Sequence, residues 1–65
     1  MTKAEALQAL KEGKKITHRY YTSDEYLRMV GGKIYTEDGF CMGDEYSEFW
    51  SKIQKWKDDW SIYNN

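Results

Sequence analysis

The first residues of the chain have the spacing of an amphipathic helix. The apolar positions fall on one side of such a helix: Ala6, Leu7 and Leu10. Thr2 is followed three residues later by Glu5, the spacing of a capping box, in which each side chain accepts a hydrogen bond from the other residue's backbone N–H. Gly13 stands where a left-handed residue commonly ends a helix. The pattern predicts a helix over residues 3–12.

From Lys15 onward, the period of the apolar positions changes to two, the period of a strand. Alternate residues on one side of this strand are Ile16, His18 and Tyr20, and those on the other side are Thr17, Arg19 and Tyr21. Side chains that are β-branched or aromatic are typical of strands. Residues 22–24 form a polar break, and residues 25–30 are expected to form a second strand.

Gly31-Gly32 separates two alternating runs and has the length of a tight hairpin loop. Residues 33–36 should therefore return antiparallel to residues 25–30. The expected cross-strand pairs are Val30 with Lys33, Met29 with Ile34, Arg28 with Tyr35, and Leu27 with Thr36. The expected core face, which the first helix should cover, consists of Leu27, Met29 and Ile34.

A second two-residue hairpin loop is predicted at Asp38-Gly39. This loop would pair Thr36 with Cys41 and Tyr35 with Met42, and it would leave Cys41 as a small buried side chain in a three-stranded meander. The opposite face of the meander would carry Tyr26, Arg28, Val30, Tyr35, Phe40 and Met42. So much apolar surface should not stay exposed. Either the C-terminal segment or a second subunit is expected to cover it.

The C-terminal segment carries a second capping-box spacing, because Ser51 is followed three residues later by Gln54. Three apolar positions then continue a helical period: Ile53, Trp56 and Trp60. This pattern predicts a short helix near residues 52–58. A longer helix from Asp44 is the competing interpretation, since further aromatic residues share the same phase. Residues 60–63 are expected to form a last strand.

These elements define one small domain over residues 1–65. The expected fold class is α+β: an N-terminal helix packed on a small antiparallel sheet, with a short C-terminal helix and a final strand. A chain of this size buries only about 60% of the surface that it exposes when unfolded, and the lone Cys41 forbids an internal disulfide. Aromatic residues make up 17% of the chain. This surplus of large apolar side chains favours a homo-oligomer.

Charge is distributed unevenly. Residues 1–20 contain five basic and two acidic residues, whereas residues 21–50 contain two basic and seven acidic residues, and the net charge is −1. A chain without excess positive charge is not expected to bind duplex nucleic acid directly. No apolar run approaches the roughly 20 residues that span a bilayer, and no signal-peptide core follows Met1. Together with a free cysteine, these features predict a cytoplasmic protein without a membrane partner.

Individual residues form no recognisable catalytic motif. His18 could act as an acid–base group or contact a phosphate, but the strand alternation favours a half-buried structural histidine. Cys41 has no histidine at a familiar spacing, and the carboxylates of residues 37–48 fit no metal-binding loop. We therefore expect no enzyme activity, no cofactor and no metal.

One group of residues combines positive charge with aromatic rings: His18, Arg19, Tyr20 and Tyr21 after Lys14-Lys15, with Arg28 opposite Tyr35. Aromatic faces stack on a base and arginines bind phosphates, so this combination favours a nucleotide ligand. The alternative for Arg28 and Tyr35 is an ordinary cross-strand cation–π pair.

The two ends of the chain resemble a family of small phage proteins. The opening runs through Glu5-Ala6-Leu7 and Leu10 to Thr17, and the close is Asp59-Trp60-Ser61-Ile62. In that family, an EAL..LK.GK.V.R..W opening accompanies a W..S..D…DW.I close. The chain is similar to the second Thoeris anti-defence family, the nucleotide-sponge proteins, over its first and last quarters. Departures from the family pattern are His18-Arg19, Tyr20-Tyr21, Trp50 and Gln54, and a shorter middle.

The resemblance implies an α+β subunit that oligomerises and sequesters a cyclic nucleotide-like immune signal without chemistry on it. We therefore expect a phage or prophage anti-defence protein in the cytoplasm of the host cell. The expected ligand-binding residues are Arg19, Tyr20, Tyr21, Arg28 and Trp50. The alternative is a protein-binding inhibitor, similar to an anti-CRISPR protein, whose acidic residues 37–48 mimic nucleic acid in the basic groove of a host nuclease.

Overall fold

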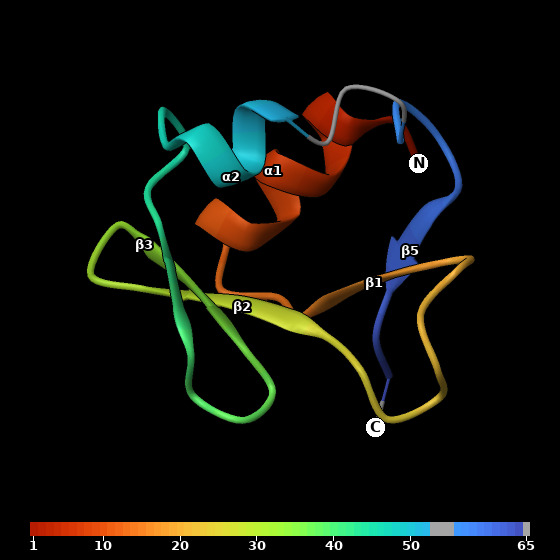
Figure 1. The fold of residues 1–65 in the computed structure, drawn as a ribbon. Coiled ribbons are helices and arrows are strands. Elements are labelled where there is room, and N and C mark those ends of the chain that lie inside the picture. Colours follow the sequence, from red (N-terminus) through yellow and green to blue (C-terminus); the bar gives the residue numbers. More distant parts are fainter. Residues whose placement is uncertain (53–55, 65) are drawn as a thin grey trace.

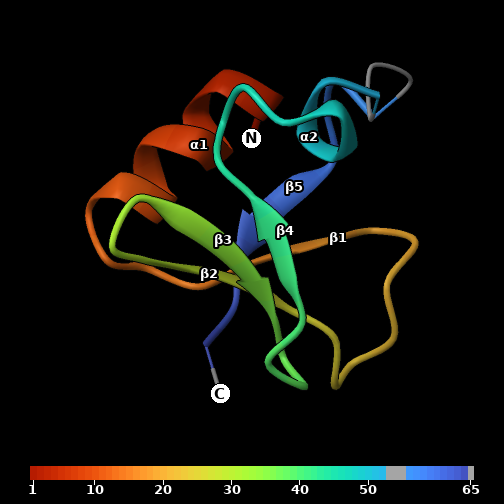
Figure 2. The same cartoon turned by 60° about the vertical axis from the view of Figure 1, so that its left-hand side comes forward.

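The computed structural model describes residues 1–52 and 56–64, and within them it has an α+β architecture, as the sequence predicts (Figure 1). The elements in chain order are α1 (Lys3–Lys11), β1 (Ile16–His18), β2 (Leu27–Val30), β3 (Lys33–Thr36), β4 (Cys41–Gly43), α2 (Glu48–Lys52) and β5 (Trp60–Ile62). The strands form one antiparallel sheet in the order β4-β3-β2-β1-β5. Both helices lie over the same face of this sheet (Figures 1 and 2).

Helix α1 begins and ends through the capping groups that its sequence predicts. The Thr2 N–H donates to Glu5 Oε1 at 2.9 Å, and the Glu5 N–H donates to Thr2 Oγ1 at 3.1 Å, which completes the capping box. At the other end, Gly13 has a φ of 87°. The backbone N–H groups of Gly13 and Lys14 donate to carbonyl oxygens of the last turn, both at 3.0 Å, in a Schellman arrangement.

The hydrophobic core lies between the helices and the sheet. Its buried side chains are Ala6, Ala9 and Leu10 from α1, Ile16, Leu27, Ile34, Met42 and Trp60 from the strands, and Trp50 from α2. Leu27 and Ile34 belong to the predicted core face, and Met29, the third member, is partly buried against it. The β2–β3 pairing from Leu27–Thr36 to Val30–Lys33 follows the predicted register throughout. Strand β1 ends at His18, earlier than the alternation suggests.

The β3–β4 hairpin differs from the prediction by one residue. Tyr35 pairs with Cys41, where a two-residue loop would pair Tyr35 with Met42. The Gly39 N–H donates to the Thr36 carbonyl at 3.0 Å, and the Thr36 N–H donates to the Phe40 carbonyl at 2.9 Å. The loop therefore contains three residues and ends on Gly39 with a φ of 87°, the geometry of a turn followed by a bulge.

The Asp38 side chain explains why the longer loop forms. Its carboxylate accepts a hydrogen bond from the Thr36 hydroxyl and another from the Phe40 N–H at 3.4 Å. These bonds, led by the one from Thr36, lower the pKa of Asp38. A two-residue loop would need positive φ at Asp38, whereas the three-residue loop needs it only at Gly39.

This shift of one residue reverses the faces of β4 relative to the prediction. Met42 lies in the core, with 6% of its surface exposed, and Cys41 is exposed. The prediction that Cys41 is buried is therefore wrong. The prediction that Met42 belongs to the outer face is wrong for the same reason. The outer face of the sheet is consequently less apolar than the sequence pattern suggests.

The C-terminal part of the chain packs on the helical side and at a sheet edge. Helix α2 (Glu48–Lys52) lies earlier than the predicted range 52–58, and residues 56–59 are not helical. The Ser51–Gln54 capping box includes a residue outside those that the structure describes. The predicted last strand is confirmed as β5, which pairs with β1 from Ile16–Ile62 to His18–Trp60. The described C-terminal residues therefore leave most of the outer sheet face uncovered.

Candidate aromatic binding site

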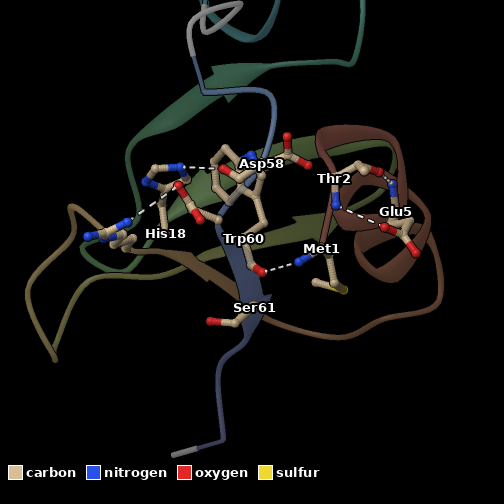
Figure 3. A pocket seen from close by; sticks show the side chains of 9 residues that line it. Met1, Thr2, Glu5, His18, Asp58, Trp60 and Ser61 are labelled. Carbon is tan, nitrogen blue, oxygen red and sulfur yellow. Dashed lines mark hydrogen bonds and ion pairs between the residues drawn. The ribbon is translucent and has the colours of Figure 1, made fainter.

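His18 is the buried polar residue at the end of β1, with 3% of its surface exposed. The Tyr20 N–H donates to His18 Nδ1 at 3.2 Å, and His18 Nε2 lies 2.9 Å from the Asp58 carbonyl oxygen (Figure 3). Because Nδ1 accepts a hydrogen bond, the ring proton is on Nε2 and is donated to Asp58. Both ring nitrogens are hydrogen-bonded to backbone groups, and the ring is buried, where the sequence predicts a half-buried histidine.

Four aromatic rings surround the imidazole, and we call this group the His18 cluster: His18, Tyr20, Tyr21, Trp56 and Trp60. Trp56 stacks on His18 with ring centres 4.3 Å apart and planes 12° apart. Trp60 meets the same imidazole edge to face at 4.7 Å. Tyr21 contacts Trp56 at 5.5 Å and Trp60 at 6.1 Å, both edge to face. Offset and edge-to-face pairs of this kind contribute about 0.5–1.5 kcal/mol each beyond their buried area.

The outer part of the His18 cluster is open to solvent. Tyr20 is 68% exposed and lies 5.3 Å from the His18 ring and 5.9 Å from the Trp56 ring. Tyr21 and Trp56 are partly exposed. Burial, with smaller contributions from the carboxylates of Glu25 and Glu37, raises the pKa of Tyr21. Its hydroxyl therefore stays protonated at neutral pH and can donate a hydrogen bond.

Arg19 lines the same pocket as His18 and Trp60 of the His18 cluster. Its side chain is 70% exposed, and its guanidinium Nη1 lies 4.0 Å from Asp59 Oδ2. The Arg19 backbone N–H also donates to the Asp59 carbonyl at 3.1 Å. Asp59 has a φ of 72°, a conformation that short polar side chains such as Asp and Asn tolerate better than others. The exposed ion pair is loose, so the guanidinium is accessible to an anion.

A pocket of about 560 Å³ adjoins the His18 cluster. It is lined by Met1, Thr2, Glu5, His18, Arg19, Asp58, Asp59, Trp60 and Ser61 (Figure 3). Three of these residues carry carboxylates, and Arg19 supplies the cationic side chain. Glu5 belongs to the capping box, and the hydrogen bonds from Thr2 lower the pKa of the Glu5 carboxyl group. An anionic group would therefore meet attraction at Arg19 and repulsion at Asp58 and Asp59.

Of the five predicted site residues, the structure brings three together: Arg19, Tyr20 and Tyr21. Trp50 is in the core with 5% of its surface exposed, 5.8 Å from Trp60 between ring centres and beneath the Lys3 ammonium at 5.1 Å. Arg28 is exposed on the outer face of β2, opposite Tyr35. Trp56 and Trp60 were not predicted to belong to the site. The spacing of Trp56 and Trp60 predicts a helix. In the structure, β5 pairs with β1 so that Trp60 lies opposite His18, and Trp56 stacks on the His18 ring.

The comparisons with known proteins give no further identification: no protein-family model, curated protein or solved structure matches the chain. Within residues 1–52 and 56–64, no group of His, Cys, Asp and Glu side chains has the arrangement of a metal site. In the same part of the chain, no helix has the length and apolar character to cross a membrane.

Proposed function

We propose that this chain is a phage anti-defence protein that binds and sequesters a nucleotide-derived immune signal without catalysis, in the cytoplasm of the host cell. The observation that carries the proposal is the exposed aromatic surface of Tyr20, Tyr21 and Trp56, which contacts His18, together with the pocket that His18 and Arg19 both line. The resemblance of both chain ends to the nucleotide-sponge family gives independent support.

The chemistry of this surface suits a nucleotide. A base stacked on an aromatic side chain contributes about 1–3 kcal/mol, and a guanidinium forms charge-assisted hydrogen bonds with phosphate oxygens. The base would lie against Tyr20 and Trp56, and a phosphate would bind Arg19. His18 supports the rings rather than reacting, because both of its nitrogens are bonded to backbone groups.

The proposal includes a homo-oligomer. Strand β4 lies at an edge of the sheet, and the exposed rings of Phe40 and Tyr46 flank it, at 61% and 83% exposure. An edge strand offers unpaired backbone groups to a second chain, and exposed rings beside it can pack across such a contact. Light scattering coupled to size-exclusion chromatography measures the assembly, and Phe40→Ser with Tyr46→Ser should reduce it to single chains.

The direct test is thermal unfolding, followed by tryptophan fluorescence, against cyclic dinucleotides, cyclic trinucleotides and cyclic ADP-ribose isomers. A ligand at 100 times its Kd adds about 2.7 kcal/mol. Since a domain this small shifts by about 4–8 °C per kcal/mol, the midpoint should rise by roughly 10 °C or more. No shift with any of these compounds would contradict the proposal.

Matched variants locate the ligand. Arg19→Gln and Tyr20→Leu should each abolish most of the shift, whereas Arg28→Gln, on the opposite face of the sheet, should preserve it. Asp59→Asn should tighten binding of an anionic ligand several-fold, because it removes the carboxylate 4.0 Å from the Arg19 guanidinium. Weaker binding by Asp59→Asn would indicate that the pocket selects a cationic group.

The structure gives less support to an acidic nucleic-acid mimic. The acidic residues of segment 37–48 are divided between the loop before β4, the residues that follow β4 and the first residue of α2 (Figure 2). Glu45 is also paired with Lys11, at 3.1 Å. Charges that are separated in this way do not reproduce the continuous row of phosphates along a nucleic-acid strand.

A further inference from the structure

The outer face of the sheet, opposite the helices, is a second surface with its own chemistry. Its residues follow from the strand pairing: Arg28 and Val30 on β2 with Tyr26 just before it, Lys33 and Tyr35 on β3, Cys41 on β4, and Thr17 and Ser61 on β1 and β5. Lys15 and Tyr63 join this face at its edge, because the Lys15 ammonium lies 4.7 Å from the Tyr26 ring centre and Tyr63 packs on Tyr26 at 4.7 Å.

The charge on this face has one sign. Lys15, Arg28 and Lys33 contribute three cations, and none of them forms an ion pair with a carboxylate among residues 1–52 and 56–64. Glu25 and Glu37, the acidic residues that flank the β2–β3 hairpin, lie before β2 and after β3, at the end of the hairpin away from Lys33. Glu12, the acidic residue nearest to Lys15 in the chain, pairs with Lys14. The face therefore has a positive potential although the chain as a whole carries a net charge of −1.

Aromatic rings lie next to these cations on the face. Tyr26 lies beside Lys15, and Tyr35 pairs directly with Arg28. All three tyrosines of the face, Tyr26, Tyr35 and Tyr63, are partly exposed. Rings next to cations, on an antiparallel sheet with helices behind it, suit a partner with planar groups spaced along a chain of negative charges.

The same charge argues against a second copy of this chain on this face. In a symmetric dimer, the same patch meets itself, and here Arg28 and Lys33 would be placed against another Arg28 and Lys33. Like charges in contact across an interface cost several kcal/mol. Charge complementarity therefore selects an anionic partner.

We propose that the outer sheet face binds single-stranded nucleic acid, with bases on Tyr35 and Tyr26 and phosphates at Arg28, Lys33 and Lys15. A single strand fits better than a duplex because its bases are free to stack on side chains, whereas those of a duplex are stacked on one another. This surface is separate from the His18 cluster, which lies on the helical side of the sheet.

The test is fluorescence anisotropy with a labelled oligothymidylate of about 12 nucleotides, compared with a duplex of equal length, from 50 to 200 mM salt. Each phosphate contact of a single strand changes the slope of log K against log salt by about −0.7. Three contacts predict a slope near −2, so the affinity should fall roughly 20-fold over this range. The duplex should bind more weakly than the single strand.

Variants separate this surface from general charge effects. Arg28→Gln with Lys33→Gln should reduce the slope to about −0.7, leaving one contact, and Tyr35→Val should weaken binding roughly tenfold while keeping a residue that favours strands. Lys57→Gln removes one positive charge outside this face, as Arg28→Gln or Lys33→Gln alone does on it, and should leave the affinity within about twofold of the original.

Several outcomes would overturn the proposal. They are no anisotropy change at 50 mM salt, tighter binding to the duplex, or an equal loss of affinity with Lys57→Gln. A fourth outcome is a lower mass of the assembly, measured by light scattering, when Arg28→Gln and Lys33→Gln are combined. That result would assign the face to self-association. Arg19→Gln, in the proposed nucleotide site, should leave oligothymidylate binding unchanged. The proposal for the outer face and the proposal for the nucleotide site can therefore fail independently of each other.

Discussion

His18 illustrates how two backbone groups hold a buried polar side chain in place. The ring accepts a hydrogen bond from the Tyr20 N–H and donates one to the Asp58 carbonyl, and it stacks on Trp56. The strand alternation predicts the inward direction of this side chain. The position of Asp58, 40 residues further along the chain, depends on the β1–β5 pairing and could not be predicted from local spacing.

The variant His18→Phe tests this arrangement, because it preserves a planar ring and removes both hydrogen bonds. The Tyr20 N–H and the Asp58 carbonyl would lose their partner, at a cost of about 1–3 kcal/mol. A core of this size supplies only about 3–5 kcal/mol in total. We expect a large loss of stability in urea unfolding followed by tryptophan fluorescence. Tyr46→Phe, on an exposed ring, should change stability by less than about 0.5 kcal/mol, and an equally small change for His18→Phe would contradict the argument.

Among the elements, α1 is the one that local sequence specifies most completely. Its capping box, its apolar stripe and its terminal Gly13 lie within a single short segment, so the capping interactions at both ends of the helix are local. A long-range contact is added at its start, where the Lys3 N–H donates to the Lys57 carbonyl at 2.7 Å. The β2–β3 register is predictable for the same reason, because the two-residue loop fixes it. The β3–β4 register is not, because the loop geometry depends on hydrogen bonds from Thr36 and Phe40 to Asp38.

The variant Gly13→Ala measures the contribution of the C-terminal cap. Gly13 has a φ of 87°, and nothing lies within 4 Å of the position that a Cβ atom would take. The loss of stability in this variant therefore comes from the backbone conformation and not from a clash with neighbouring atoms. An L-residue in the left-handed region costs about 1–2 kcal/mol, so the unfolding midpoint should fall by at least about 4 °C. Ala4→Gly, at an exposed position of the same helix, should cost about 1 kcal/mol through helix propensity. An unchanged midpoint for Gly13→Ala would show that the helix end relaxes without a left-handed residue.

At the scale of the whole molecule, the sequence predicts the kinds of residue in the candidate site better than their positions. Arg19, Tyr20 and Tyr21 are adjacent in the chain and remain together in the structure. Trp56 reaches them only because β5 pairs with β1, and Arg28 is separated from them by the thickness of the sheet. The cationic and aromatic residues therefore belong to two surfaces, one on each side of the sheet. The order of these residues in the sequence does not show which surface each one joins.

The raised pKa of Tyr21 links the aromatic site to the stability of the whole domain. Burial raises this pKa above its unfolded value of about 10, so the folded state retains the phenol proton where the unfolded chain releases it. The resulting contribution is complete below about pH 10 and is lost as the pH rises through the folded pKa. Tyr21→Phe keeps the edge-to-face contacts with Trp56 and Trp60 but has no proton to lose.

We therefore expect Tyr21→Phe to lose less stability than the original chain between pH 7 and about pH 11, measured by urea unfolding at both values. The difference between the two proteins isolates Tyr21, because they differ only in this side chain. Tyr46→Phe, on a ring that is 83% exposed, should lose as much stability as the original chain. If Tyr21→Phe behaved like Tyr46→Phe, the Tyr21 hydroxyl would be as accessible to water as that of Tyr46. The aromatic surface would then be looser in solution than its ring contacts indicate.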